Sequence, residues 1–460
     1  MKAIFNELLS SIPDYKEFLT AREMDASSFG LAEQFPDVVE IIDIGSTRAG
    51  NTLHCLRIGN DKTKPNALLL GCPHPNEPIG AMMLEYLSRQ LAASAELREA
   101  FGYNCYILKA WDYDGLCMNE GWLKGPYTVG HYAAGVYRPA SHLQVDWTFP
   151  LVHRDYAFTE VLPETEAVKK LIDETGPAFI YSLHNAGFGG VYWYISEAMP
   201  PEVYELMGKA AARQGVPLHL GEPEVPIVQE LSPAIYRMGE VSDLYDFLYE
   251  NMGPEAANGL GMGRNSAGYG KAECGAYSLL TELPFFFDKR ICDMTPSDAT
   301  RGECLLADLD FTDESDRDIL SLIEKAAGLI SPDNLFHTTL LSFTQSENTG
   351  ARREMIGASE DSGDIVTQSQ KFSMTVEPMF YKLLSFGMLV RLFDHELDIT
   401  PDAGAETALR GFRKEAAELF ESYKDRLLAQ LNCEAVSIRK LVEIQLESGL
   451  IISSELLCKR

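Results

Sequence analysis

Short apolar runs of strand length recur through the first part of the chain, and turn-forming residues close each of them. The predicted strands lie at 38–44, 52–58, 66–71, 103–108, 179–183, 191–195 and 277–280. Between them, apolar residues recur at helical spacing, as they do after Pro78 and over 163–174. Because strands alternate with helices, the pattern predicts an α/β fold with a mixed, largely parallel sheet flanked by helices over about residues 36–300.

Beyond residue 300 the pattern changes to helical periodicity with few strand signals. Helices are predicted at 319–330, 378–393, 400–431 and 435–446, with Thr400 as the N-cap of the third and 346–369 as the least ordered connection. We therefore divide the chain into an N-terminal helical extension (1–35), an α/β domain (36–300) and a C-terminal helical domain (301–460). We expect the last of these to be a contact surface for a homo-oligomer.

Charge and composition exclude several classes of partner. The 39 Lys and Arg against 68 Asp and Glu give a net charge of −29. Nucleic acid and anionic membrane surfaces are disfavoured, because both require a surplus of basic residues. The longest apolar stretch, 380–393, contains two basic residues and is shorter than the about 20 residues of a membrane span. Nine scattered cysteines without a C-x-x-C pair, and a start without an export signal, predict a reduced, cytoplasmic chain.

Histidine is scarce, with nine residues in 460, and three of them begin an H-x-x-[DE] motif. At this content of acidic residues the motif alone is a weak signal. The motifs that begin at His219 and His395 lie among prolines and in the helical region. The pair His74 and Glu77 instead follows a predicted buried strand and opens a helix, at the strand end where α/β proteins bind ligands.

A hydrolytic zinc site needs three protein ligands and an open position for water. His184 is the best third ligand, because it ends the predicted strand 179–183 and would face the same crevice as His74 and Glu77. The alternative is a hydrogen-bonded histidine at a strand end without a metal role. We expect one Zn²⁺ ion.

Four segments carry a family resemblance by their order along the chain. They are 39–59, GCPHPNE at 71–77, SLH at 182–184 and LLTELP at 279–284. In this order they resemble the opening strands, the H-x-x-E zinc motif, the third-ligand strand and the final motif of the zinc metallocarboxypeptidases of the carboxypeptidase A type. The chain resembles a divergent member of that family over about residues 36–290.

The resemblance implies a zinc-dependent hydrolase that cleaves a peptide or amide bond near a substrate terminus. His74, Glu77 and His184 would hold the metal, and Glu282 would act as the general base that takes a proton from the activated water. Arg138 is the candidate for stabilising the developing oxyanion. A surface acid at a strand end and a solvated loop arginine are the alternative interpretations of Glu282 and Arg138.

The sequence departs from the family where the substrate carboxylate should bind. The family's D-L-N-R-N-F-P type of segment corresponds to QVDWTFP at 144–150, which lacks the arginine. Arg264, in the glycine-rich stretch 259–270, is the candidate replacement, and the five glycines suggest a mobile lid. Tyr269 is the candidate proton donor. Trp147, one of four tryptophans between 111 and 193, either lines an aromatic substrate pocket or belongs to the core.

Two alternative functions stay open at this point. One is an N-acyl amino acid amidase or deacylase on the same fold, similar to the aspartoacylase relatives, which the missing arginine favours. The other is a catalytically inactive zinc-binding scaffold, which would lack a ligand or the base, whereas all four residues are present. The expected partner is a peptide or an amidated small-molecule substrate.

Overall fold

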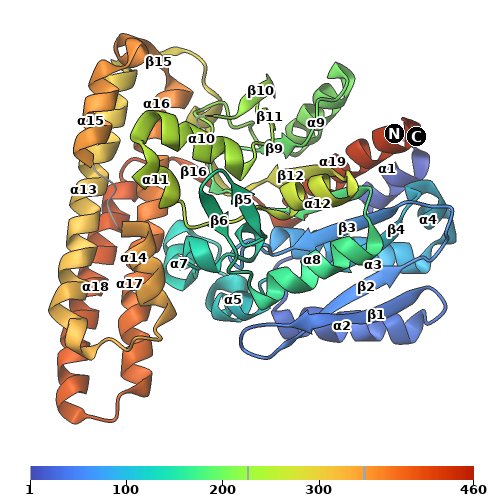
Figure 1. The fold of residues 1–460 in the computed structure, drawn as a ribbon, viewed down its shortest axis with the longest axis horizontal. Helices are drawn as coiled ribbons and strands as arrows, with labels where there is room; N and C mark the ends of the chain where they lie inside the picture. Colours follow the sequence, from blue (N-terminus) through green and yellow to red (C-terminus); the bar gives the residue numbers. More distant parts are fainter. Residues whose placement is uncertain (1, 225–226, 345–348, 460) are drawn as a thin grey trace.

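A nine-stranded mixed sheet forms the centre of the computed structural model, which describes residues 2–224, 227–344 and 349–459 (Figure 1). Its spatial order is β1 (Val39–Ser46), β2 (Thr52–Ile58), β4 (Asn104–Leu108), β3 (Asn66–Gly71), β7 (Phe179–Leu183), β12 (Tyr277–Glu282), β9 (Tyr192–Ile195), β11 (Ile235–Arg237) and β10 (Gln229–Ser232). The central strands from β4 to β12 run parallel, whereas β1, β2 and β10 each pair antiparallel with a neighbour. The predicted α/β fold is confirmed, with parallel pairing concentrated at the centre of the sheet.

Alternate residues of the central strands face two separate apolar cores. Leu69 and Tyr181 belong to the larger core, and Leu68 and Ile180 belong to the smaller one on the other face. The larger core is covered by α3 (Ile79–Ala93), α9 (Pro201–Gln214) and α19 (Ile438–Cys458). The smaller core is covered by α8 (Pro163–Thr175) and α12 (Ser266–Cys274). Because helices bury both faces, the central strands are continuous apolar runs, which is why the sequence identifies them.

The N-terminal segment and the connections contain short elements around this centre. α1 (Ala3–Ser10) packs against α19 and α4 (Ala95–Phe101), and α2 (Ala21–Gln34) packs against β1 and α3. The other short elements are α5 (Tyr113–Met118), α6 (Glu120–Leu123), α7 (Val129–Gly135), β5 (Leu151–His153), β6 (Tyr156–Phe158), β8 (Gly187–Phe188), α10 (Val241–Met252), α11 (Pro254–Asn258), β13 (Pro284–Asp288), β14 (Pro296–Thr300), β15 (Ile365–Thr367) and β16 (Cys433–Ala435).

Residues 301–428 form a helical module that stands as a column beside the sheet in Figure 1. Its helices are α13 (Arg301–Ala326), α14 (Leu335–Thr344), α15 (Thr349–Ala358), α16 (Gln368–Thr375), α17 (Glu377–Ile399) and α18 (Ala403–Leu428). α17 joins the module to the α/β part, where it packs against α7. The guanidinium of Arg391 donates hydrogen bonds to the carbonyls of Met118, Gly135 and Val136.

Three features of the C-terminal region differ from the sequence prediction. α19 leaves the helical module and packs on the sheet and its helices. The prediction assigns this segment to the C-terminal domain, whereas the structure packs it with the α/β part. The predicted loose connection at 346–369 contains α15 and β15 in its described part, and 346–348 lie outside the described residues. The N-cap of α18 is Asp402, whose carboxylate accepts from the amide of Ala405, in place of Thr400.

None of the helices in the described residues combines the length and the apolar character that a membrane crossing requires.

Candidate active site

Three neighbouring parallel strands deliver four predicted site residues to one edge of the sheet. His74 and Glu77 lie on the turn from β3 to α3, His184 directly follows β7, and Glu282 ends β12. β7 pairs with β3 on one side and with β12 on the other, both in parallel. Because the carboxyl ends of these strands meet, residues more than 200 positions apart in the sequence become neighbours.

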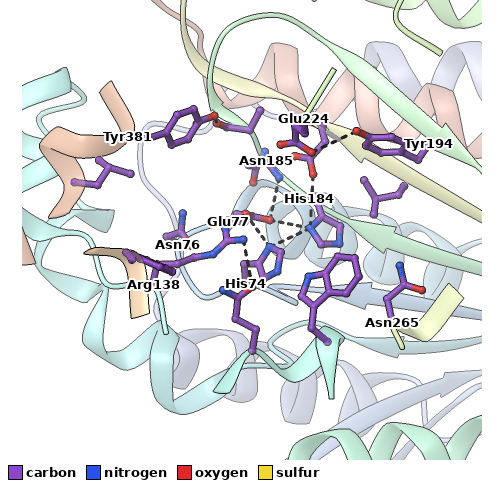
Figure 2. A pocket seen from close by; sticks show the side chains of 18 of the residues that line it. His74, Asn76, Glu77, Arg138, His184, Asn185, Tyr194, Glu224, Asn265 and Tyr381 are labelled. Carbon is purple, nitrogen blue, oxygen red and sulfur yellow. Dashed lines mark hydrogen bonds and ion pairs between the residues drawn. The ribbon is translucent and has the colours of Figure 1, made fainter. Parts of the chain in front are cut away.

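The two histidines and Glu77 converge on one point (Figure 2). The Nδ1 atom of His74 lies 3.0 Å from Glu77 Oε1, the Nδ1 atom of His184 lies 3.1 Å from Glu77 Oε2, and the two Nδ1 atoms lie 3.2 Å apart. All three side chains are buried. In the described part of the chain, this is the group of three whose ligand atoms could hold one metal ion.

The donor set fits zinc. Two imidazoles and one carboxylate are ligands found in catalytic zinc sites, where water takes the fourth position. The two ring nitrogens lie 3.2 Å apart beside the carboxylate, so all three side chains can reach one cation. Burial and the positive charge of Arg138 lower the pKa of His74 to about 4, which keeps its imidazole in the neutral form that binds metals.

A carboxylate behind His184 fixes the orientation of that ring. Its Nε2 atom lies 2.9 Å from the hydroxyl of Ser182 and 3.6 Å from Asp146 Oδ2. Asp146 is held in turn by the amide of Ser266 at 2.6 Å and the hydroxyl of Ser182 at 2.9 Å. Burial alone would lower the pKa of His184, but Asp146 and Glu77 outweigh it and raise the pKa to about 10. This support directs Nδ1 toward the metal position.

The sequence analysis does not identify Asp146 as a site residue. It interprets the segment 144–150 only through the absence of the family's arginine. The available signal was a single acid between the apolar residues Val145 and Trp147. An ionisable residue in such a setting is buried only when it has a partner.

Glu282 has the environment of a general base. Its side chain is buried, Oε1 lies 3.8 Å from His184 Nδ1, and Oε2 has no hydrogen-bond partner. Burial raises its pKa well above the usual value, and the charges of Glu77 and Glu224 act in the same direction. A carboxylate that holds a proton this readily, beside the proposed ligands, is suited to accept one from water.

Arg138 lies beside the same group of residues. Its Nη1 donates to Glu77 Oε1 at 2.6 Å, and its Nη2 lies 3.5 Å from Gln144 Oε1. The guanidinium therefore faces the metal position from the loop that follows α7 (Figure 2).

A cavity of about 650 Å³ opens in front of these residues. The α/β part contributes Trp147 and Tyr194 to its wall, and the helical module contributes Phe343, Tyr381 and Met388. Trp147, for which the sequence leaves a pocket or a core position open, lines this cavity, and contact with a substrate stays a prediction.

Arg264 and Tyr269 are not among the residues that line this cavity. The Tyr269 hydroxyl donates to Asp173, and its ring stacks on Phe149. The backbone of Arg264 pairs with Phe149, and a Cβ atom at Gly263 would overlap the carbonyl oxygen of that phenylalanine. Gly263 therefore packs against neighbouring backbone, and the lid expected over 259–270 stays a prediction.

Comparisons with known proteins agree with the sequence resemblance. Residues 25–116 match the family model described as zinc carboxypeptidase. No curated protein matches the chain.

Three solved structures illustrate what this chain is similar to. Carboxypeptidase A from Helicoverpa armigera is 16% identical, with 61% of this chain and 71% of that chain covered and a TM-score of 0.38. The metallo-carboxypeptidase from Burkholderia cenocepacia is 18% identical, with 56% and 59% covered and a TM-score of 0.36. Bovine thrombin-activatable fibrinolysis inhibitor is 14% identical, with 58% and 86% covered and a TM-score of 0.34.

At TM-scores this low the structural likenesses carry no argument of their own. The matched segment contains His74 and Glu77, whereas His184 and Glu282 lie beyond it. The resemblance to the zinc carboxypeptidase family is confirmed, and it rests on the segment that carries the H-x-x-E motif.

Proposed function

We propose that this protein is a zinc-dependent hydrolase of the metallocarboxypeptidase type that cleaves a peptide or amide bond near a substrate terminus. The convergence of His74, Glu77 and His184 beside the buried Glu282 is the observation that carries this proposal. The family match over residues 25–116 supports the choice of metal.

Each residue of the site has a role that its surroundings favour. His74, Glu77 and His184 would hold one Zn²⁺ ion, which supplies a Lewis acid and lowers the pKa of water. Glu282 accepts a proton from the attacking water and delivers it to the leaving nitrogen, since its raised pKa suits both transfers. Arg138 donates hydrogen bonds toward the oxygen of the scissile carbonyl as negative charge develops there.

Arg138 is held by Glu77 in the structure, and this contact would weaken once the carboxylate coordinates a metal ion. Trp147 and the apolar wall of the cavity would pack against the substrate and exclude water from the reacting bond.

An amidase or deacylase for N-acyl amino acids is a second candidate on the same residues. The cavity wall, where Arg264 is absent and Arg138 is bonded to Glu77, offers a bidentate guanidinium to neither substrate class. Peptides and N-acyl amino acids both carry a free carboxylate, so substrate screening decides between them.

Metal analysis of the purified protein and two variants tests the proposal. We expect about one zinc per chain in the wild type, strong loss of zinc in His74→Ala, and retained zinc in Glu282→Gln with turnover reduced at least about a hundredfold. His395→Ala is the matched control, because this exposed histidine of the helical module also begins an H-x-x-D motif. Undiminished zinc in His74→Ala would overturn the site assignment.

Substrate screening separates the two candidates. Short peptides with free and with amidated C-termini are compared with N-acyl amino acids, using the wild type and Glu282→Gln. Cleavage of peptides supports the peptidase, and cleavage of N-acyl amino acids alone supports the amidase. Activity that is unchanged in Glu282→Gln would refute the role of this residue in either case.

A further inference from the structure

Asn265 presents an unused hydrogen-bond donor to the cavity. The residue lines the cavity wall and is 8% exposed. Its Oδ1 atom accepts from the amide of Gly268 at 2.8 Å, which makes Asn265 the N-cap of α12. Among the described residues no acceptor pairs with its Nδ2 atom, and this atom keeps accessible surface.

The helix cap fixes the direction in which this amide group points. Only the oxygen of the side-chain amide can accept from a backbone N–H, so the bond to Gly268 turns Nδ2 of Asn265 to the other side. Figure 2 shows Asn265 and Arg138 on opposite sides of the proposed metal ligands. An oriented donor without a partner at a cavity wall points to an acceptor that a ligand supplies.

The charged groups next to Asn265 are carboxylates. Ser266, the next residue, donates its amide to the buried Asp146 at 2.6 Å. Glu240 lines the cavity and lies near Asn265, since a Cβ atom at Gly268 would be 2.6 Å from Glu240 Oε2 and 3.2 Å from Asn265 Oδ1. Both acids would repel a substrate carboxylate bound at Nδ2, whereas an uncharged acceptor avoids this repulsion.

The basic side chains of the cavity are already paired with acids. In the described part of the chain, the lysine and the arginine that line the cavity are Lys382 and Arg138. Lys382 forms an ion pair with Asp316. Arg138 donates to Glu77. A substrate carboxylate would have to displace one of these acids, whereas an uncharged carbonyl needs only the donor of Asn265.

We propose that Asn265 binds the substrate through its Nδ2 atom and that the acceptor is the uncharged carbonyl oxygen of an amide. This inference rests on the proposed function for the bond that is cleaved. Beyond the scissile bond, the substrate would carry an amide in place of a free carboxylate. A terminal carboxamide and a further peptide bond are the two sources of such a group.

Calorimetric titration of the full-length, zinc-loaded Glu282→Gln variant tests the binding step without turnover. The probes are N-acetylphenylalanine amide, N-acetylphenylalanine and N-(2-phenylethyl)acetamide, which share one body and carry a carboxamide, a carboxylate or a hydrogen at the same carbon. Their phenyl ring suits the apolar part of the wall, which includes Leu244 and Met388. We expect the carboxamide to bind roughly two- to tenfold more tightly than the hydrogen analogue, as one neutral hydrogen bond provides. A carboxamide that binds no better than the hydrogen analogue, or no binding of any probe, would overturn the proposal.

Asn265→Ser, introduced into the same protein, removes the donor and keeps the helix cap, because serine ranks with asparagine as an N-cap and its shorter side chain does not reach the position of Nδ2. The carboxamide should then bind like the hydrogen analogue, whereas the affinities for the other two probes stay unchanged. Asp402→Ser is the matched control, because it exchanges the exposed N-cap of α18 and should leave all three affinities unchanged. Carboxamide affinity that is retained in Asn265→Ser, or carboxylate affinity that falls by the same factor, would overturn the proposal. The comparison of carboxamide with hydrogen analogue holds even if Asn265→Ser does not fold.

A hydrolysis series on the wild type distinguishes the two sources and keeps this inference separable from the proposed function. Benzoyl-alanyl-phenylalanine is compared with its C-terminal amide and with the same peptide extended by one alanine, and cleavage of the alanine–phenylalanine bond is measured. A preference for the amide identifies a terminal carboxamide, and a preference for the extended peptide identifies a further peptide bond. Fastest cleavage of the peptide with the free carboxylate would overturn the inference. If no peptide is cleaved in a zinc-dependent reaction, the proposed function fails, whereas the titration still decides the role of Asn265.

Discussion

Replacing Asp112 by asparagine should change how the stability of the protein depends on pH. Asp112 follows β4 and is the N-cap of α5, where its Oδ1 accepts from the amide of Gly115 at 3.0 Å. The side chain is 1% exposed, and its Oδ2 atom is buried without a partner. Burial, only partly offset by Arg48, raises the pKa of Asp112 from 3.8 to about 7.

The raised pKa sets the sign and the size of the contribution of Asp112 to the free energy of unfolding. Because the folded pKa lies above the unfolded one, the folded state binds the proton more tightly, so this group costs stability progressively as pH rises from about 4 to 7. At about 1.4 kcal/mol per pKa unit, the shift corresponds to an upper limit of about 4 kcal/mol above pH 7. Between pH 5 and pH 8 the cost grows by roughly 2 to 3 kcal/mol.

Urea unfolding followed by tryptophan fluorescence at pH 5, 6, 7 and 8 measures this effect. Asparagine keeps the Oδ1 acceptor but cannot ionise. The free energy of unfolding of Asp112→Asn, relative to that of the wild type, should therefore rise by roughly 2 to 3 kcal/mol between pH 5 and pH 8. Titrating groups that do not interact with Asp112 are common to both proteins and cancel in the difference. A difference in stability that is constant over this range would refute the reasoning.

Three further substitutions test separate parts of the structure. Asp146→Asn should weaken zinc affinity by about 10- to 100-fold in competition with a chelator, and unchanged affinity would contradict its supporting role. Gly387→Ala should lower the melting temperature by several degrees, because a Cβ atom there overlaps the carbonyl of Ala133, and an equal melting temperature would refute this contact. Tyr269→Phe should leave turnover within about twofold, since its hydroxyl donates to Asp173, and a tenfold loss would restore it as the proton donor.

The sheet and the proposed ligands were predictable because they depend on local signals. The strands at 66–71 and 179–183 have the same bounds in the structure, since buried parallel strands are largely apolar runs. The antiparallel strand at 52–58 also keeps its predicted bounds. His74 and His184 follow two of these strands directly, so the order of strands along the chain was enough to place them at one edge.

The substrate side of the site was not predictable, because it is built by contacts between distant segments. Tyr381 and Asp308 reach the cavity only through the packing of the helical module against the α/β part, which no local pattern encodes. Arg264 and Tyr269 belong to a glycine-rich stretch whose sequence does not show which segment it packs against. Backbone pairing at Phe149 places them away from the cavity.

Because α19 covers one face of the central sheet, that face is completed only when the C-terminal helix has been synthesised. It supplies the carbonyl of Gln445 to the hydroxyl of Tyr181 and the hydroxyl of Ser448 to the indole of Trp193. β12 ends at Glu282 and α19 begins at Ile438, so 155 residues must be translated between them. At a translation rate of roughly 5–20 residues per second, one face of the sheet stays uncovered for roughly 10–30 s after β12 has been synthesised.

During that interval the growing chain exposes a large apolar surface. The helical module is translated within the same interval, so it can assemble before the sheet is closed. Removal of residues 438–460 should therefore yield a chain that depends on chaperones or aggregates, even though every proposed zinc ligand would still be present.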